Sequence, residues 1–225
     1  MRPRQAKIAC LWAGATQACP FMTRILMELP FRGQRTYLHG TDLYNAVTSV
    51  LVDQFPHLRG GRVAVNFHTL LQKQPDLLVG AGDLDAERAR VEYRGEFVIG
   101  DGEQAGRALI LESNREVTRR ILCPEDRLME KAQVDPATRR ASMEPADATP
   151  IENLVALTKK LHLTVLPELS RKWLFVRLML ARPLPAERPR HMEVRLQGVM
   201  GDRMTRCGVW FDNELVGTIF FCTPT

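Results

Sequence analysis

The sequence has few cysteines, and they show none of the spacings that bind zinc or build a disulfide framework. The five are odd in number, widely separated and contain no Cys-x-x-Cys pair. They are Cys10, Cys19, Cys123, Cys207 and Cys222. We therefore expect no metal site and no set of disulfides, and a reducing cytoplasm is the simplest location. Because Cys207 lies in an alternating stretch, we expect its thiol to be packed rather than reactive.

The sequence also lacks a long hydrophobic run. No segment approaches the roughly 20 apolar residues that a membrane-spanning helix needs. Residues 1–7 are basic and precede the apolar stretch 8–15, which imitates a signal peptide but barely reaches the length of its hydrophobic part. We expect a soluble cytoplasmic protein that does not bind membranes, with export as the less favoured alternative.

Several catalytic and cofactor motifs are missing. There is no His-Glu-x-x-His, Gly-x-Ser-x-Gly or EF-hand pattern, which argues against a zinc protease, an α/β-hydrolase and a calcium site. The Gly-Asp steps at 100–102 and 201–202 lie between predicted strands, so they indicate hairpin turns and not a phosphate loop. We expect no bound cofactor.

Composition and charge indicate a globular protein with a mild basic excess. The 225 residues are 45% hydrophobic, enough for one substantial core or two small ones. The net charge of +5 is spread along the chain, which permits acidic partners. Short basic pairs raise nucleic acid binding as a less favoured alternative; no nucleic-acid motif accompanies them, and solvated faces are the simpler interpretation. The pairs are 119–120, 139–140, 159–160 and 171–172, the last beside Trp173 and Phe175.

An internal repeat is the strongest positive signal. The segments 55–67 and 166–178 match in a Pro-x-Leu run before an apolar stretch, and 92–101 and 193–202 match in Glu-x-Arg and Gly-Asp. Asn, Val and Cys of 114–123 recur in 213–222, with only short loop insertions between the matches. We interpret these matches as a duplication; a chance similarity between two β-rich stretches is the alternative.

A helix is predicted before each sheet. Apolar residues at 43, 46, 47, 50 and 51 share one helical face, with Thr41 or Asp42 as the N-cap. A similar stripe at 151, 154, 155 and 161 follows Thr149-Pro150, a cap followed by proline. Asn45 and Asn153 occupy equivalent positions in the two helices.

Strands and a linker complete the predicted organisation. Alternation over 192–197 and the stretches 205–211 and 215–221 predict a three-stranded meander. The segment 134–150 has no apolar period and is predicted to be an unpacked linker. We therefore predict an N-terminal repeat with an extension over 1–133, the linker over 134–150 and a C-terminal repeat over 151–225. Residues 1–35 are expected to supply either a helix or the first strand.

A helix followed by a curved antiparallel meander, present twice, resembles the hotdog superfamily in its double form, from Thr36 to Pro224. The predicted fold class is α+β, an internally duplicated double hotdog in which each half is a central helix wrapped by a curved antiparallel sheet. The resemblance implies binding, and often hydrolysis or dehydration, of acyl-CoA or acyl-carrier-protein thioesters. A noncatalytic binding or scaffold protein is the alternative. Hotdog sheets often pair edge to edge, so the resemblance also implies a homodimer as one assembly.

The resemblance implies a site at the start of the first helix, where hotdog thioesterases place an acidic base or nucleophile. His39-Gly40-Thr41-Asp42 stands there. Asp42 is the candidate base or nucleophile, and as a base it would activate a water that His39 or Asn45 orients. Gly40 and Thr41 shape a substrate site where helix amides favour developing negative charge. Simple helix capping is the alternative.

Asn66 and His68 share one face of a predicted strand and are candidates to line an acyl pocket, with a surface pair as the alternative. The His-x3-Gly-x4-Pro pattern of dehydratases is not found in the first half, and its Asp-x3-His or Asp-x3-Gln partner is not found in the second. Hydrolysis or acyl binding is therefore favoured over dehydration. The second half has Glu152 and Asn153 but no His-Gly-Thr-Asp run, so any catalysis is expected in the first half.

Overall fold

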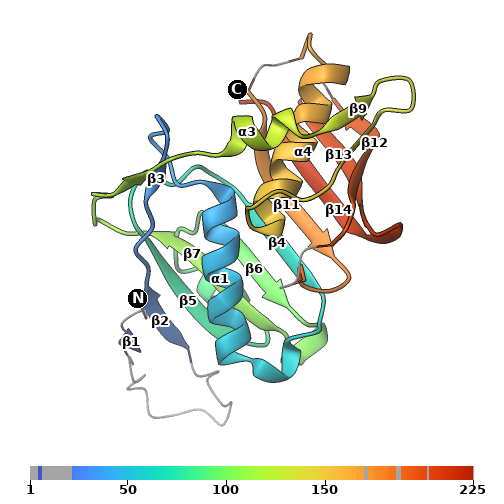
Figure 1. The fold of residues 1–225 in the computed structure, drawn as a ribbon. Helices are drawn as coiled ribbons and strands as arrows, with labels where there is room; N and C mark the ends of the chain where they lie inside the picture. The colour runs from blue at the N-terminus through green and yellow to red at the C-terminus, as the bar shows by residue number, and fades with distance from the viewer. Residues whose placement is uncertain (1–4, 7–21, 170–171, 186–188, 202, 225) are drawn as a thin grey trace, which may run out of the picture. The chain divides into compact units, whose positions relative to one another are not determined.

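The computed structural model describes residues 5–6, 22–169, 172–185, 189–201 and 203–224 (Figure 1). The chain divides into two compact units, 1–62 with 66–121 and 63–65 with 122–225, each of which has antiparallel strands and one long helix. Cys10, Cys19 and the apolar stretch 8–15 lie outside the described residues. No helix in the described part of the chain is long and apolar enough to cross a membrane.

The first unit is an antiparallel sheet with one long helix. Its order in the sheet is β1-β2-β5-β7-β6, followed by β4, whose residues 63–65 group with the second unit. Residues 23–26 form a strand, which decides between the two structures expected for 1–35. The elements are β1 (Gln5–Ala6), β2 (Thr23–Leu26), β3 (Phe31–Arg32), α1 (Gly40–Gln54), β4 (Val63–Phe67), β5 (Pro75–Ala81), α2 (Asp85–Arg88), β6 (Gly95–Ile99), β7 (Gly106–Glu112) and β8 (Arg120–Ile121).

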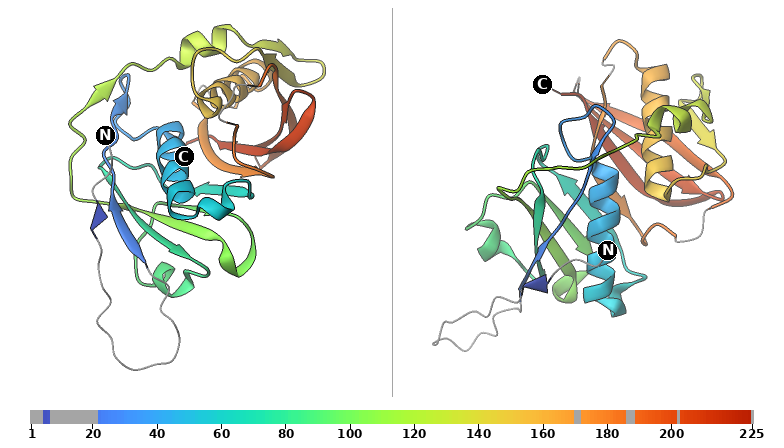
Figure 2. Two further views of the ribbon diagram at one scale, coloured as in Figure 1. Left: turned by 60° about the horizontal axis from the view of Figure 1, so that its bottom comes forward. Right: turned by 60° about the vertical axis from the view of Figure 1, so that its left-hand side comes forward.

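The helix α1 covers one face of β6 and β7, as Figures 1 and 2 show. Its buried stripe includes Leu43, Val47 and Leu51, as the spacing predicted. Across from it, Phe97 and Leu109 are almost fully buried on β6 and β7. The predicted N-cap is wrong, because α1 begins at Gly40, and His39 occupies the cap position without a capping side-chain bond.

The second unit is a six-stranded sheet with two helices, in the order β11-β14-β13-β12-β10-β9. The predicted meander is confirmed, since β12, β13 and β14 are consecutive antiparallel neighbours. The elements are α3 (Glu125–Glu130), β9 (Gln133–Asp135), β10 (Arg140–Met143), α4 (Pro150–Val165), β11 (Leu174–Leu180), β12 (Met192–Met200), β13 (Met204–Phe211) and β14 (Glu214–Cys222).

The segment 134–150, predicted to be an unpacked linker, is part of the second unit. It contains β10, which pairs with both β9 and β12, and it buries Ala141 and Met143. Only two apolar side chains face the core from this short strand, so the sequence shows no sustained period. The helix α3 packs against α4 through Leu128 and Ala156, which places residues 122–133 with the second unit too.

The helix α4 starts where the sequence predicted. The hydroxyl oxygen of Thr149 accepts a hydrogen bond from the Glu152 amide, and the Glu152 carboxylate accepts one from the Thr149 amide at 2.8 Å. This capping box pairs two amides that the helix itself leaves unbonded. Pro150 follows at the first helical position, where it needs no amide hydrogen.

Replacing Thr149 with Ala is expected to lower the free energy of unfolding by about 1 kcal/mol, because the cap hydroxyl is lost. Urea unfolding at neutral pH measures the change. Thr164→Ala is the matched control, since that hydroxyl donates to the Lys160 carbonyl of the same helix and caps no helix start. Equal losses from the two variants would contradict a special role for the cap.

The two units share an element order but not a sheet order. Apart from the short elements β3 and α2 of the first unit, both units have a strand, a helix and four strands in this order along the chain, as β2, α1, β4 to β7 and as β10, α4, β11 to β14. The sheet order is β2-β5-β7-β6-β4 in the first unit but β10-β12-β13-β14-β11 in the second, so the last two strands exchange places. The match of 92–101 with 193–202 therefore aligns β6 with β12, which are not equivalent. What recurs there is a local hairpin pattern.

Candidate functional site

The start of α1 holds a nearly buried ion pair. The Nε of Arg32 donates to one oxygen of Asp42 at 2.6 Å, and its Nη2 donates to the other at 2.5 Å. The two side chains are only 10% and 11% exposed. Arg32 lies on β3, which pairs in parallel with β8. The candidate base is thus bound to a cation through both carboxylate oxygens.

This ion pair holds the Asp42 carboxylate in one orientation. A bidentate arginine uses one acceptor position on each oxygen, and a carboxylate has about four such positions. Two positions therefore remain for a water or a substrate group. Arg32 was not among the sequence-based candidates, since nothing in a run such as Phe-Arg-Gly indicates a partner ten residues later.

His39 and Thr41 form a second polar contact at the same helix start. The His39 Nδ1 and the Thr41 Oγ1 are 2.7 Å apart, and both residues are buried. The contact with Thr41 holds the imidazole ring in place. Gly40 is the first residue of α1, where helix geometry leaves amides without an intrahelical acceptor. Asn45 is half-buried one turn further along.

The contacts of Asn66 and His68 are with residues outside the first turn of α1. The Asn66 amide donates to Glu96 on β6 at 3.2 Å, and Glu96 also accepts from Arg88 at 2.6 Å. His68 is exposed, and its ring meets Tyr93 edge-on at 5.2 Å. These contacts lead to β6 and to the loop before it, so they support the surface-pair alternative more than an acyl pocket.

A second polar cluster, which sequence reasoning missed, lies in the core of the second unit. The His162 Nε2 is 3.5 Å from the Cys207 Sγ, and the His162 ring packs 4.5 Å from Trp173 and 5.3 Å from Phe221. Burial lowers the pKa of His162 to about 3 and raises the pKa of Cys207 to about 12. Both groups are neutral near pH 7, whereas a nucleophilic cysteine requires a thiolate. The pair is therefore packing, as predicted for Cys207.

The sequence did carry a signal for this cluster. His162 follows Leu161 on α4 and lies four residues after Thr158, which is itself fully buried. Both polar residues thus fall within the apolar stripe that begins at Leu154. Trp173, beside the basic pair 171–172, is 2% exposed, so it offers no surface for a nucleic-acid base.

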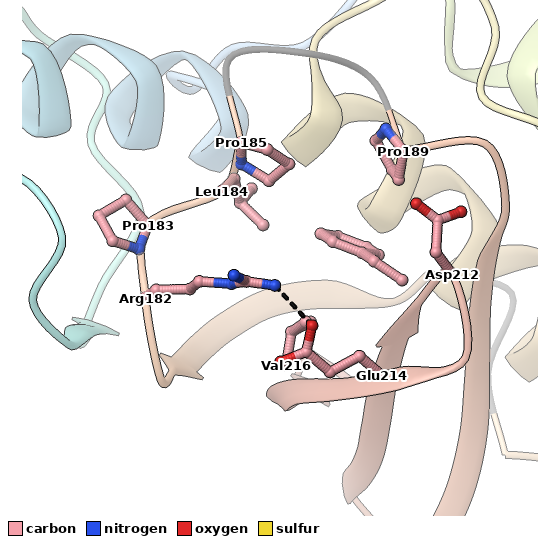
Figure 3. A pocket seen from close by; sticks show the side chains of 9 residues that line it. Arg182, Pro183, Leu184, Pro185, Pro189, Asp212, Glu214 and Val216 are labelled. Atoms are coloured by element: carbon pink, nitrogen blue, oxygen red, sulfur yellow. Dashed lines mark hydrogen bonds and ion pairs between the residues drawn. The ribbon is translucent and has the colours of Figure 1, made fainter.

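A pocket of about 370 Å³ opens at one end of the strands of the second unit (Figure 3). Figure 3 shows Arg182 bound to Glu214 on one side and the Asp212 carboxylate on the other. Phe211 and Val216 line it as well, and Leu184 and three prolines form the rest of the wall. The Arg182–Glu214 pair is more than half exposed, so solvent screens these charges. Among the described residues, no three His, Cys, Asp or Glu side chains gather to hold a metal.

Solved structures of similar shape are dehydratases and thioesterases. The dehydratase domain from the CurF module of curacin polyketide synthase superposes with a TM-score of 0.51 at 9% identity, over 98% of this chain and 97% of that one. The fold is of the hotdog type. A putative oleoyl thioesterase from Lactobacillus plantarum has a TM-score of 0.49 at 11% identity, over 92% of this chain and 98% of that one.

An acyl-ACP thioesterase from Bacteroides thetaiotaomicron has a TM-score of 0.45 at 10% identity, over 89% of this chain and 96% of that one. No protein-family model and no curated protein sequence matches the chain. At these identities the similarity establishes the hotdog fold, an α+β architecture with antiparallel sheets and long helices, and does not extend to activity.

Proposed function

We propose that this protein binds acyl thioesters, as acyl-CoA or acyl-carrier protein, and hydrolyses them at the start of α1. The observation that carries the proposal is the buried polar group there, in which Asp42 is anchored by Arg32 beside the His39–Thr41 contact. Within the hotdog fold we further propose that the two units are halves of a double hotdog that have diverged in strand order.

The proposed chemistry uses the first turn of α1. Asp42 accepts a proton from a water through an oxygen position that Arg32 leaves open, and the water oxygen attacks the thioester carbonyl. The amides of Gly40 and Thr41 stabilise the oxyanion. The carbon–sulfur bond then breaks, and the leaving thiolate takes the proton, which yields a free acid and a thiol. His39 orients the water from its fixed ring, and Asn45 is the second candidate for this role.

Binding without hydrolysis is the second candidate function, and one observation favours it. Arg32 already holds both oxygens of Asp42, which ties up the carboxylate that hydrolysis requires. In that case the same polar group positions the thioester and releases it unchanged.

Asp42→Asn is expected to lower thioester hydrolysis by roughly 10²-fold, because the base is lost while the shape of the side chain is kept. Release of free thiol from short-, medium- and long-chain acyl-CoA measures the rate. Asp53→Asn, at the exposed end of the same helix, is the matched control and should retain full activity. Circular dichroism checks that both variants fold.

Two outcomes would count against hydrolysis. If Asp42→Asn keeps its rate, catalysis does not depend on this carboxylate. If the wild type hydrolyses no substrate but calorimetry detects acyl-CoA binding that Asp42→Asn weakens, the binding role is the correct one.

A further inference from the structure

The outer face of the second unit's sheet carries cations and aromatic rings in cross-strand rows. Arg177 on β11 is opposite Phe220 on β14, which is opposite Arg206 on β13. Side chains alternate along a strand, and the neighbours Cys207 and Phe221 point toward His162 on α4. This row therefore points away from the core. We call the following set the arginine face: Arg140, Arg177, Arg195, Arg206, Trp210 and Phe220.

Two of these arginines are held against rings. The guanidinium carbon of Arg195 lies 4.3 Å from the centroid of the Trp210 ring, and that of Arg177 lies 5.5 Å from the centroid of the Phe220 ring. A planar cation on an aromatic face is attracted by the ring electrons. Because these contacts already restrict the two arginine side chains, the side chains lose less conformational entropy when a partner binds.

The charge of the arginine face is not balanced within the described residues. Two carboxylates are cross-strand neighbours of these six residues. Asp135 lies opposite Arg140, and Glu193, which is 9% exposed, contacts Arg195 and Arg140. Arg177 and Arg206 are exposed, and neither has a carboxylate partner in the described part of the chain. The surface thus presents cations that an anionic partner would neutralise.

Apolar side chains border the arginine face. Met200 and Met204 are opposite each other at the end of β12 and β13, and they are 44% and 39% exposed. Arginine, methionine and aromatic residues are the types enriched at protein–protein interfaces, and methionine adapts to different partner shapes. Arg195 and Arg177 each lie over one face of the Trp210 and Phe220 rings, which leaves less ring surface for stacking bases. These features favour a protein over a nucleic acid.

We propose that the arginine face docks an acidic protein whose contact surface combines carboxylates with an apolar centre. Arg177 and Arg206 contact the carboxylates, while Met200 and Met204 contact the apolar centre. The charges steer the encounter and the apolar contacts slow dissociation. As the probe we choose an acyl-carrier protein in its apo form, a choice that rests on the proposed function.

The test is a titration of fluorescently labelled apo-carrier protein with the full chain at low and at physiological salt. Saturable binding is expected, weaker at higher salt, and the double variant Arg177→Glu with Arg206→Glu should raise the Kd at least tenfold. The matched control carries the same change of charge at exposed positions of the first unit, Arg90→Glu with Arg119→Glu, and should bind like the wild type. Met204→Ser should weaken binding without changing its salt dependence.

Three results would overturn the proposal. Equal losses in the two double variants would mean that only net charge matters. Tighter binding of a single-stranded oligonucleotide, lost in the Arg177 and Arg206 variant, would identify a nucleic-acid surface. Absence of binding would exclude the docking surface for this probe class. Because the apo-carrier has no acyl group, Asp42→Asn should dock like the wild type, and a failure of hydrolysis leaves the docking result unaffected.

Discussion

Arg32→Ala is expected to lower the free energy of unfolding by about 3 kcal/mol, because it leaves the Asp42 carboxylate without its bidentate cation. Asp42 is 11% exposed, so water replaces the lost hydrogen bonds only in part. Removing one member of a nearly buried ion pair therefore costs more than the pair itself contributes. Urea unfolding at pH 7, followed by circular dichroism, measures the change.

A double-mutant cycle separates the pair from its surroundings. Arg32→Met with Asp42→Leu removes both charges and keeps similar volumes, and it should recover most of the stability lost in Arg32→Ala. The control is Arg62→Ala, whose partner Asp101 is 66% exposed and whose loss should cost less than about 0.5 kcal/mol. If Arg32→Ala lowers the free energy of unfolding as little as Arg62→Ala does, solvent already screens the Arg32–Asp42 pair.

This cycle also bears on the proposed chemistry at Asp42. If the ion pair mainly stabilises the fold, Asp42→Asn should lower stability and leave any thioester hydrolysis intact. If Arg32 positions a catalytic carboxylate, Arg32→Lys should retain stability better than activity, because lysine keeps the charge but not the bidentate geometry. Stability and thioester hydrolysis change by different amounts in Arg32→Lys only if Asp42 acts on the substrate.

Local patterns in the sequence predicted the local structure well. The apolar stripes correctly predicted both long helices, and Thr149-Pro150 correctly predicted the start of α4. Caps and helical faces depend on residues within a few positions of one another, so they can be recognised in the sequence. The meander over β12 to β14 was predicted for the same reason. The sequence did not predict that the last two strands exchange places between the units. A hairpin pattern does not specify which neighbour a strand takes in the sheet.

The candidate site depends on contacts that sequence patterns do not encode. Asp42 was found because it is an acidic residue in the first turn of a recognisable helix, but its partner Arg32 comes from a two-residue strand whose pairing with β8 is set by tertiary structure. The contact of His39 with Thr41 was not predicted either. The N-cap position was misjudged by two or three residues, which is enough to change which side chain faces which.

Acid is expected to destabilise the protein through His162 well before its carboxylates are fully protonated. Burial lowers the pKa of His162 from 6.5 to about 3, and its Nδ1 has no hydrogen-bond partner among the described residues. Between these pH values the unfolded chain binds a proton that the folded chain does not, so stability is complete above about pH 6.5 and falls as pH decreases toward 3. By pH 4.5 the loss should reach roughly 3 kcal/mol.

The comparison that isolates this effect is His162→Phe, which keeps a ring against Trp173 and Phe221 but does not titrate. Urea unfolding of both proteins at pH 7, 5.5 and 4.5 gives two curves of stability against pH. The difference between them should grow in favour of the variant as pH falls, because the other titrating groups are common to both. Parallel curves would mean that water reaches the imidazole and that His162 is not held neutral in the core.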